Sequence, residues 1–412
     1  MSSPAAGSGT ILTVTLNLAL DVTYVTGGVD WDGVNRVRSV HRRAGGKGIN
    51  VARVLAALGC DVLVTGLAGG PNGGAAEADL SAAGLPAALT PIAAESRATL
   101  AVCDPAPLPY GTAPPGASPD DPAPAGTVPN DPARTGTPPD APGVPRGSGS
   151  VREDAAPART ADPRTALFNE PGPVVTDAEL DDFLRGYDRR LRGAAAVVIS
   201  GSLPPGVPAA FYAELAARAR ERGVPAIVDA DGEPLRAAPA GRPAVLKPNA
   251  EELARALSAV DPRTRDGVPG GGGARYSGSE ARGPGTGVPE IGLPEIGQAP
   301  VAGALAGAEV LRRDGAESVV VSLGADGLLA VTPEGAWRAA MPYRVAGNPT
   351  GAGDALVAGL ALGLVEGTPW PDRLRRAAAL GAAAVAAPVA GDFDEETFRR
   401  VHPGIRVDPI RP

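Results

Sequence analysis

The chain has 412 residues, of which 43% are hydrophobic and 3% aromatic, and its formal net charge is −8. Its acidic balance and the lack of a long basic run make nucleic acid and anionic membrane surfaces unlikely partners. With only two cysteines, the chain is not expected to have a disulfide framework, and without an apolar run of 18 residues it is not expected to span a membrane. Since the sequence also shows no signal-peptide pattern, we expect a cytoplasmic protein.

Apolar strands alternate with amphipathic helices along most of the chain. Strands are predicted, in chain order, over residues 11–16, 62–67, 195–199, 224–228, 244–246, 318–321 and 328–332. Helices are predicted over residues 47–58, 176–191, 209–222, 250–257, 301–313, 352–364 and 370–387. Thr176 and Glu179 form the pattern of a capping box at the start of one helix. The alternation predicts an α/β fold with a mainly parallel sheet that helices cover on both faces.

Two other regions alternate polar and apolar residues without helical spacing. They are residues 22–41, and residues 99–102 together with 166–169. We interpret them as a small, half-exposed antiparallel sheet that is separate from the main sheet.

Two segments have the composition of disordered insertions. Residues 105–162 are rich in proline, and residues 262–300 are rich in glycine and contain the duplicated sequence PEIG. Such segments bury too little apolar surface to offset their ordering entropy. Without them roughly 315 residues remain, which is the size of one large α/β domain spanning residues 11–400.

The most informative motif is Gly351-Ala352-Gly353-Asp354, which lies directly before an apolar helix. Free N–H groups at a helix start attract phosphate oxygens. A carboxylate among them would repel a phosphate ligand, so its suitable role is to accept a proton from an attacking hydroxyl. For the isolated motif, an ordinary helix start with Thr350 as N-cap is the alternative.

Several further motifs follow predicted strands, where ligands gather in parallel sheets. Asp21 could hold sugar hydroxyls, and the sequence GGKGIN at residues 45–50 brings glycines, Lys47 and Asn50 to the start of a helix. The sequence SGSLPPG at residues 200–206 forms a tight loop after a strand. Each has a plain structural alternative as a strand end, cap or turn.

Asn249 and Glu252 follow Lys247 at the start of another helix. Their oxygen ligands suit Mg²⁺ held largely through water, and a capping pair is the structural alternative. The sequence SLGADG at residues 322–327 joins two strands and could line a nucleotide.

In order and spacing, these motifs resemble the ribokinase-like (PfkB-type) carbohydrate kinases, from residue 11 to about residue 400. The sequences SRAT at residues 96–99 and NEPGP at residues 169–173 add similarity to the branch of 1-phosphofructokinase, tagatose-6-phosphate kinase and the minor 6-phosphofructokinase. The resemblance implies a three-layer α/β/α domain, with a small β-sheet lid from residues 22–44 and a hairpin at 97–104 and 163–172.

The resemblance also implies a role for each matching residue. Asp354 is the catalytic base, and Gly351, Ala352 and Gly353 form the anion hole. The acceptor would contact Asp21, Gly46, Asn50 and Arg97, with Lys47, Arg97 and Arg36 as cations for a phosphorylated sugar. ATP would contact Lys247, Ser322, Gly324, Ala325, Asp326 and Gly327, and Mg²⁺ would be tied to Asn249 and Glu252.

The hypothesis is therefore ATP-dependent phosphorylation of a hexose phosphate, with fructose 1-phosphate as the preferred acceptor. Tagatose 6-phosphate, fructose 6-phosphate, or an unphosphorylated sugar or nucleoside are alternatives within the same fold. A catalytically idle sugar-phosphate sensor is an alternative of another class. Relatives often form homodimers through the lid, and the insertion at 105–162 puts that contact in doubt. Leu18 stands where the family usually has proline, which should change loop stiffness rather than chemistry.

Overall fold

The structure is a computed structural model that describes residues 9–27, 29–30, 32–104, 164–258 and 300–410. The segments predicted to be disordered, 105–162 and 262–300, lie outside the described residues, except that a helix begins at Pro300. The chain divides into two compact units. One comprises Met1–Val22, His41–Leu100 and Phe168–Pro412, and the other comprises Thr23–Val40 and Ala101–Leu167.

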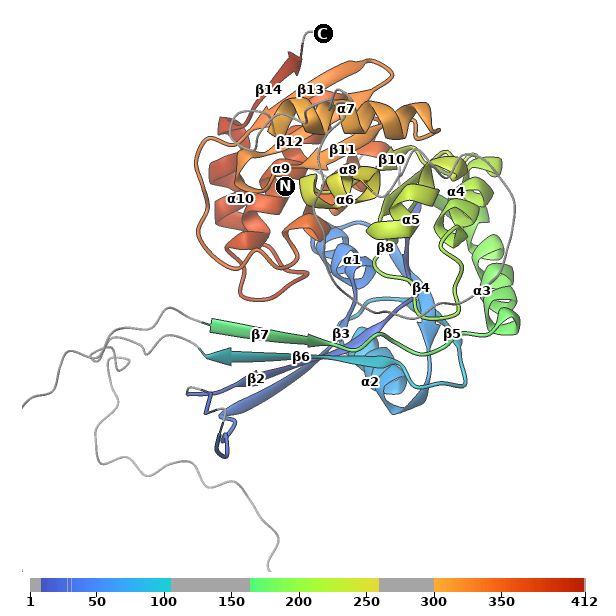
Figure 1. Cartoon of the computed structure of the whole chain (residues 1–412), viewed down its shortest axis with the longest axis vertical. Coiled ribbons are helices and arrows are strands. Elements are labelled where there is room, and N and C mark those ends of the chain that lie inside the picture. Colours follow the sequence, from blue (N-terminus) through green and yellow to red (C-terminus); the bar gives the residue numbers. More distant parts are fainter. Residues whose placement is uncertain (1–8, 28, 31, 105–163, 259–299, 411–412) are drawn as a thin grey trace, which may run out of the picture. The chain divides into compact units, whose positions relative to one another are not determined.

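The larger unit is built on a ten-stranded sheet in the order β14-β13-β12-β11-β10-β9-β8-β1-β4-β5 (Figure 1). The strands from β11 to β5 in this order are parallel, and β12, β13 and β14 are antiparallel to their neighbours. The strands are β1 Thr10–Thr15, β4 Val62–Ala68, β5 Ala87–Pro91, β8 Ala194–Ser200, β9 Ala226–Asp229, β10 Val245–Leu246, β11 Val319–Ser322, β12 Leu328–Thr332, β13 Gly335–Ala340 and β14 Arg406–Ile410.

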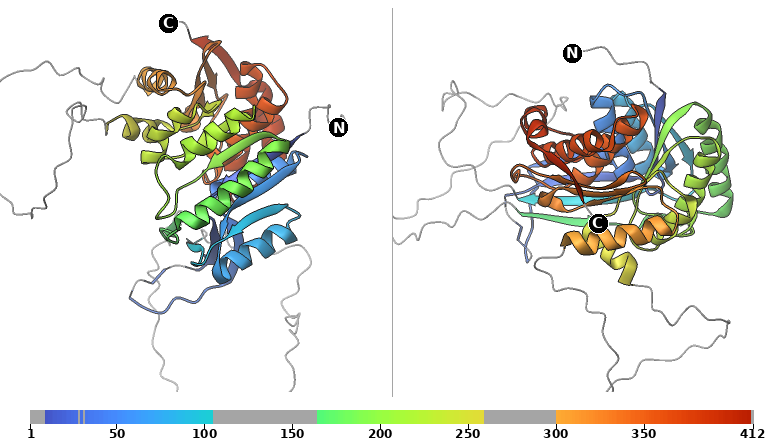
Figure 2. Two further views of the ribbon diagram at one scale, coloured as in Figure 1. Left: turned by 90° about the vertical axis from the view of Figure 1, so that its right-hand side faces the viewer. Right: turned by 90° about the horizontal axis from the view of Figure 1, so that it is seen from above.

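Helices cover both faces of this sheet. The helices are α1 Lys47–Ala57, α2 Gly70–Ala82, α3 Asp177–Arg190, α4 Phe211–Glu221, α5 Gly232–Ala237, α6 Ala250–Ser258, α7 Pro300–Arg313, α8 Ala352–Val365, α9 Trp370–Val385 and α10 Glu395–Val401. Figure 2 shows α9 and α10 on one side of the sheet and α7 on the other. The larger unit therefore has three layers.

Successive side chains of each strand point to opposite faces of the sheet, so the strands contribute to two separate hydrophobic cores between the layers. Ile11 packs into one cluster with residues of α1, α8 and α9, and the next residue, Leu12, packs into a second cluster with residues of α3, α4 and α7. Both side chains are 1% exposed, as expected for parallel strands buried on both faces. The predicted α/β architecture with a mainly parallel, doubly covered sheet is confirmed.

A second sheet has four strands in the order β3-β2-β6-β7. Its strands are β2 Ala19–Val25, β3 Ser39–Gly45, β6 Arg97–Asp104 and β7 Arg164–Asn169, and β6 and β7 point in opposite directions (Figure 1). The predicted small separate sheet is therefore present. Asp21 lies within β2, whereas the sequence suggested a position at the end of a strand.

The capping box at the start of α3 is confirmed, since Thr176 accepts from the N–H of Glu179 and the Glu179 side chain accepts from the N–H of Thr176. Helix α2 escaped prediction because its sequence begins GPNGG and buries only Gly73, Ala76 and Leu80. In the described part of the chain, no helix combines the length and apolar character needed to cross a membrane.

Candidate active site

The motif at residues 351–354 starts helix α8. Gly351 is the N-cap with φ 85°, a left-handed conformation that favours glycine. The N–H of Ala352 donates to Pro349 O at 3.1 Å, whereas the N–H groups of Gly351 and Gly353 have no acceptor among the described residues. Part of the helix start is therefore free to bind an anion.

Asp354 lies in the first turn of α8 and is 5% exposed. Its Oδ2 accepts a hydrogen bond of 2.8 Å from Nδ2 of Asn50, which lies in α1. Burial and the negative charge of Asp229 raise the pKa of Asp354 to about 7, although Asn50, Lys47 and Lys247 act in the opposite direction. A carboxylate that titrates near neutral pH is suited to accept and return a proton under physiological conditions.

The glycines of residues 45–48 let α1 begin close to the end of β1. Gly46, the N-cap of α1, has φ 122°. A Cβ on Gly46 would lie 2.6 Å from Cγ2 of Thr15, and one on Gly48 would lie 2.7 Å from Val14 O. Only glycine allows this approach, which brings Lys47 and Asn50 toward α8.

Lys47 belongs to a network of charges around the buried Asp229. Its Nζ lies 3.5 Å from Oδ1 of Asp229 and 3.9 Å from Oε1 of Glu252. Nζ of Lys247 lies 3.2 Å from the same Asp229 oxygen. Burial raises the pKa of Asp229, but the two lysines outweigh it and hold that pKa below its ordinary value. Asp229, 1% exposed, thus stays ionised and holds both ammonium groups beside Asp354.

Asn249 and Glu252 form a reciprocal cap at the start of α6. The N–H of Asn249 donates to Oε2 of Glu252 at 2.7 Å, and the N–H of Glu252 donates to Oδ1 of Asn249 at 2.8 Å. Oε1 of Glu252 is left outside this cap, near Lys47. Among the described residues, no group of three or more His, Cys, Asp or Glu side chains is arranged to hold a metal ion.

A cavity of about 390 Å³ lies beside this network. Thr15, Asn17, Gly46, Lys47, Arg97, Asn169, Glu170, Pro171, Ser200, Gly201, Ser202 and Leu203 line it. Arg97 donates from Nε to Asn17 O and from Nη1 to Glu170 O, both at 3.2 Å. Its Nη2 has no acceptor among the described residues, so it can bind an anionic ligand.

Asn17 and Asp21 lie close to Arg97. Asn17 donates from Nδ2 to Pro171 O and to Oγ of Ser202, whereas its buried Oδ1 has no partner in the described part of the chain. Burial raises the pKa of Asp21, although Arg97 and a hydrogen bond to Thr99 act in the opposite direction. The cavity thus offers an unpaired hydrogen-bond acceptor, Oδ1 of Asn17, and an unpaired donor, Nη2 of Arg97, and a ligand with hydroxyl groups can use both.

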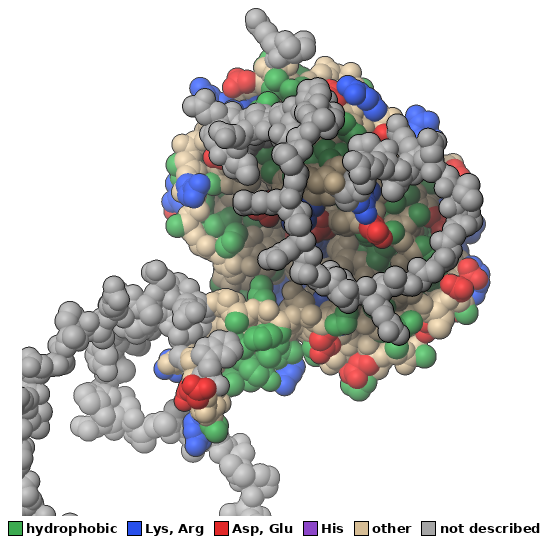
Figure 3. All heavy atoms as spheres, in the orientation of Figure 1, with side chains coloured by type: hydrophobic (Ala, Val, Ile, Leu, Met, Phe, Trp, Pro, Cys, Tyr) green, Lys and Arg blue, Asp and Glu red, His purple; other side chains and the backbone are tan. Residues whose placement is uncertain are grey.

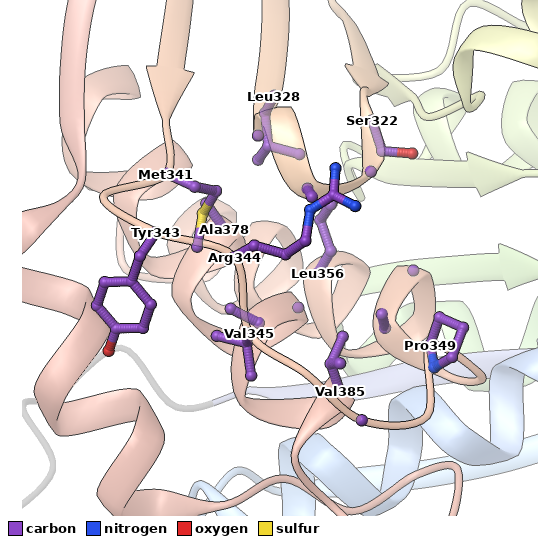
Figure 4. Close-up of a pocket in the computed structure, with 18 residues that line it drawn as sticks. Ser322, Leu328, Met341, Tyr343, Arg344, Val345, Pro349, Leu356, Ala378 and Val385 are labelled. Carbon is purple, nitrogen blue, oxygen red and sulfur yellow. The ribbon is translucent and has the colours of Figure 1, made fainter. Parts of the chain in front are cut away.

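A second cavity of about 390 Å³ lies between the β11–β12 turn and helices α8 and α9 (Figure 4). From the predicted nucleotide residues it includes Ser322, Gly324, Ala325 and Gly327, and from the α8 start it includes Ala352 and Gly353. Its walls are largely apolar, with contributions from Leu328, Met341, Leu356, Ala378 and Val385. It is therefore suited to a flat organic group next to the free N–H groups of α8.

The structure brings most of the predicted site residues together in the larger unit. Asp326 shares the β11–β12 turn with Gly324 and Ala325 but does not line the cavity. Arg36 belongs to the smaller unit, so its role stays a prediction. Sequence reasoning missed Asn17, which lines the first cavity, and Asp229, which pairs with both lysines. The sequence does contain a signal for Asp229, because this residue directly follows a predicted strand, as Lys247 and Ser322 also do.

The comparisons with known proteins agree with the fold. The chain matches the pfkB family carbohydrate kinase description over residues 15–104 and 292–397. Among the similar solved structures is phosphofructokinase-2 from Escherichia coli in complex with potassium, with 24% identity, coverage of 96% of this chain and 98% of that chain, and a TM-score of 0.68. The same enzyme in complex with fructose-6-phosphate has 23% identity, coverage of 96% and 98% of the two chains, and a TM-score of 0.65. A possible 1-phosphofructokinase from Thermotoga maritima has 22% identity, coverage of 98% and 100%, and a TM-score of 0.66.

The fold is thus the ribokinase-like α/β fold, and its site combines a buried carboxylate with a free helix N-terminus. The chain belongs to the PfkB family of carbohydrate kinases. It is an ATP-dependent phosphotransferase with a carbohydrate acceptor.

Proposed function

We propose that the protein transfers a phosphoryl group from ATP to a hexose phosphate, with fructose 1-phosphate as its preferred acceptor and fructose 1,6-bisphosphate as the product. The observation that carries the phosphorylated acceptor is Arg97, which lines the cavity beside Lys47 and whose Nη2 donates to no acceptor among the described residues. A guanidinium with a free edge is suited to a phosphate group.

Asp354 acts as the general base in this proposal. It accepts the proton of the attacking acceptor hydroxyl while that oxygen forms a bond to the γ-phosphorus, and the bond to the ADP oxygen breaks. Asn50 holds the carboxylate in place through its 2.8 Å hydrogen bond. The free N–H groups of Gly351 and Gly353, with Lys47 and Lys247 nearby, stabilise the charge on the moving phosphoryl group.

The nucleotide occupies the cavity between the β11–β12 turn and α9, with its phosphates toward the start of α8. Lys247 supports the phosphate end, since a Cβ on Gly353 would lie 3.9 Å from its Nζ. Mg²⁺ would neutralise phosphate charge, and Oε1 of Glu252, left outside the Asn249 cap, fits an ion held mainly by phosphates and water.

The similar structures favour a phosphorylated acceptor, because two of them are phosphofructokinase-2, one in complex with fructose-6-phosphate, and the third is described as a possible 1-phosphofructokinase. Tagatose 6-phosphate and fructose 6-phosphate carry the same phosphate chemistry, so Arg97 does not separate them from fructose 1-phosphate. An idle sensor is less well supported, because the buried Asp354–Asn50 pair has the geometry of a base and its holder.

Substitution of Arg97 tests the acceptor class. A charge-assisted hydrogen bond contributes about 1.5–3 kcal/mol, so Arg97→Ala should raise KM for the phosphosugar about ten- to hundred-fold. KM for ATP should change little, and Arg97→Lys should recover part of the loss. Equal effects on both KM values in a variant with unchanged melting temperature would contradict the phosphate-binding role.

We further propose that the protein forms a homodimer through its small sheet. Val34, Val37, Val40 and Leu167 are exposed apolar residues of the smaller unit, and Figure 3 shows hydrophobic side chains gathered at the surface there. Light scattering should give a dimer for the natural chain and a monomer for Leu167→Glu. A monomer for the natural chain at micromolar concentration would contradict this proposal.

A further inference from the structure

Residues 390–392, which lie between α9 and α10, pack against the proposed site of phosphoryl transfer. A Cβ on Gly351 would lie 3.0 Å from Cα of Ala390, so the segment directly adjoins the N-cap of α8. A Cβ on Gly391 would lie 3.0 Å from Oδ1 of Asn50, whose side-chain amide donates to the proposed base. The segment thus contacts both the anion hole and the residue that holds the base.

Arg43, near the end of β3, fastens this segment. Its Nη1 donates to Ala390 O at 3.1 Å, and its Nη2 donates to Oδ1 of Asp392 at 2.8 Å. The planar guanidinium makes both bonds at once, so it fixes the backbone and a side chain of the segment together. The described residues that line the two cavities do not include Arg43. Its route to the site is therefore the segment rather than a bound ligand.

The backbone next to Arg43 is itself held in place. The N–H of Ala44 donates to Oδ2 of Asp79 at 2.9 Å, and Ala44 O accepts from Nη2 of Arg53 at 3.4 Å. Arg53 and Asp79 also form an ion pair of 2.6 Å, in which the Arg53 side chain is only 9% exposed. Because solvent ions screen such a pair little, it keeps Ala44 fixed. Loss of the two Arg43 bonds should therefore release residues 390–392 and leave β3 in place.

We propose that Arg43 is a positioning residue for phosphoryl transfer, which keeps residues 390–392 in place beside the anion hole and the base. This inference rests on the proposed roles of Gly351 and Asp354. Those roles concern the transition state, so loss of the two Arg43 bonds should lower kcat and leave ground-state binding of both substrates nearly unchanged. A displacement of about 1 Å in such a site can cost about a hundred-fold in rate.

Steady-state kinetics with ATP and the best acceptor among hexose phosphates and free sugars test the inference. Arg43→Met should lower kcat about ten- to hundred-fold and change either KM by less than about three-fold. Arg43→Lys keeps the charge and should recover part of the loss. The Arg43–Asp392 pair is partly exposed, so the melting temperature of Arg43→Met should fall by no more than about 4 °C. Arg42→Met, at the exposed neighbouring arginine, is the matched control and should behave like the natural chain.

A double-mutant cycle and hydrogen exchange separate this role from other roles of Arg43. Asp392→Ala should lower kcat less than Arg43→Met does, because Ala390 O keeps its donor. The double variant should lose no more than Arg43→Met alone, since both residues act through one ion pair. Amide hydrogen exchange at residues 390–392 should become faster in Arg43→Met and stay unchanged in Arg42→Met.

Three results would overturn the assignment of Arg43. The first is an unchanged kcat in Arg43→Met, and the second is a double variant whose loss equals the product of the two single losses. The third is a rise confined to KM for the acceptor, which would mean that Arg43 acts through Asp21. Burial raises the pKa of Asp21, and Arg43 is among the groups that counteract this rise. Each result differs from a failure of the proposed function, in which the natural chain would release no ADP with any of these acceptors, or Asp354→Asn would keep its turnover.

Discussion

Substitution of Asp354 by asparagine should abolish turnover and, above neutral pH, make the fold more stable. Asp354 is 5% exposed, and burial together with Asp229 raises its pKa from 3.8 to about 7. An ionised Asp354 is therefore unfavourable in the folded state. Asparagine keeps the shape of the side chain, can still accept the hydrogen bond from Asn50, and carries no charge.

The sign of the pH dependence follows from linkage. Between pH 3.8 and about 7 the folded chain holds a proton on Asp354 that the unfolded chain has released, so stability falls as the pH rises through this window. The loss is complete above about pH 7 and corresponds to at most about 4 kcal/mol for a shift of about 3 pKa units. Asp354→Asn should thus match the natural chain at pH 4 and exceed it at pH 8.

Denaturant unfolding at pH 4, 6 and 8, together with an ADP-release assay, measures both effects. Loss of a general base costs about 10²- to 10⁴-fold in turnover. Asp181→Asn, at an exposed carboxylate on α3, is the matched control and should change neither quantity. A variant that is less stable than the natural chain at pH 8, or that keeps near-normal turnover, would refute the reasoning.

Two further predictions concern the partners of this site. Asn50→Ala removes the hydrogen bond that lowers the pKa of Asp354, so the acidic limb of the pH profile of kcat/KM should move from about pH 7 to higher pH. An acidic limb that stays at the same pH would argue against the pairing of Asn50 with Asp354. Gly381→Leu adds a side chain to the wall of the nucleotide cavity, with its Cβ 3.2 Å from Ala352 O at the start of α8 and 3.6 Å from Cβ of Leu356. It should raise KM for ATP at least about ten-fold, and an unchanged KM would place the nucleotide elsewhere.

The pattern of apolar strands was sufficient to predict the main sheet. Strand β8 is a nearly continuous apolar run, which is the pattern of parallel strands buried on both faces. Strands β13 and β14 escaped prediction because they lie at the edge of the sheet and mix exposed with buried residues. Helix α2 escaped prediction because glycine and proline dominate its first turn.

The site was predictable only in part, since its pairings join distant parts of the chain. The motifs containing Asn50 and Asp354 were apparent, but their hydrogen bond spans 304 residues. Lys47 was expected to bind phosphate, and its ion pair with Asp229, 182 residues away, could not be inferred from local pattern.

The most direct test of the central claim is the rate of ADP release with a panel of acceptors. The panel contains fructose 1-phosphate, tagatose 6-phosphate, fructose 6-phosphate, free fructose, ribose and a nucleoside, each with saturating ATP and Mg²⁺. The account predicts the highest kcat/KM for fructose 1-phosphate, and a value at least about ten-fold lower for the free sugars. A higher kcat/KM for an unphosphorylated sugar, or no ADP release with any acceptor, would contradict it.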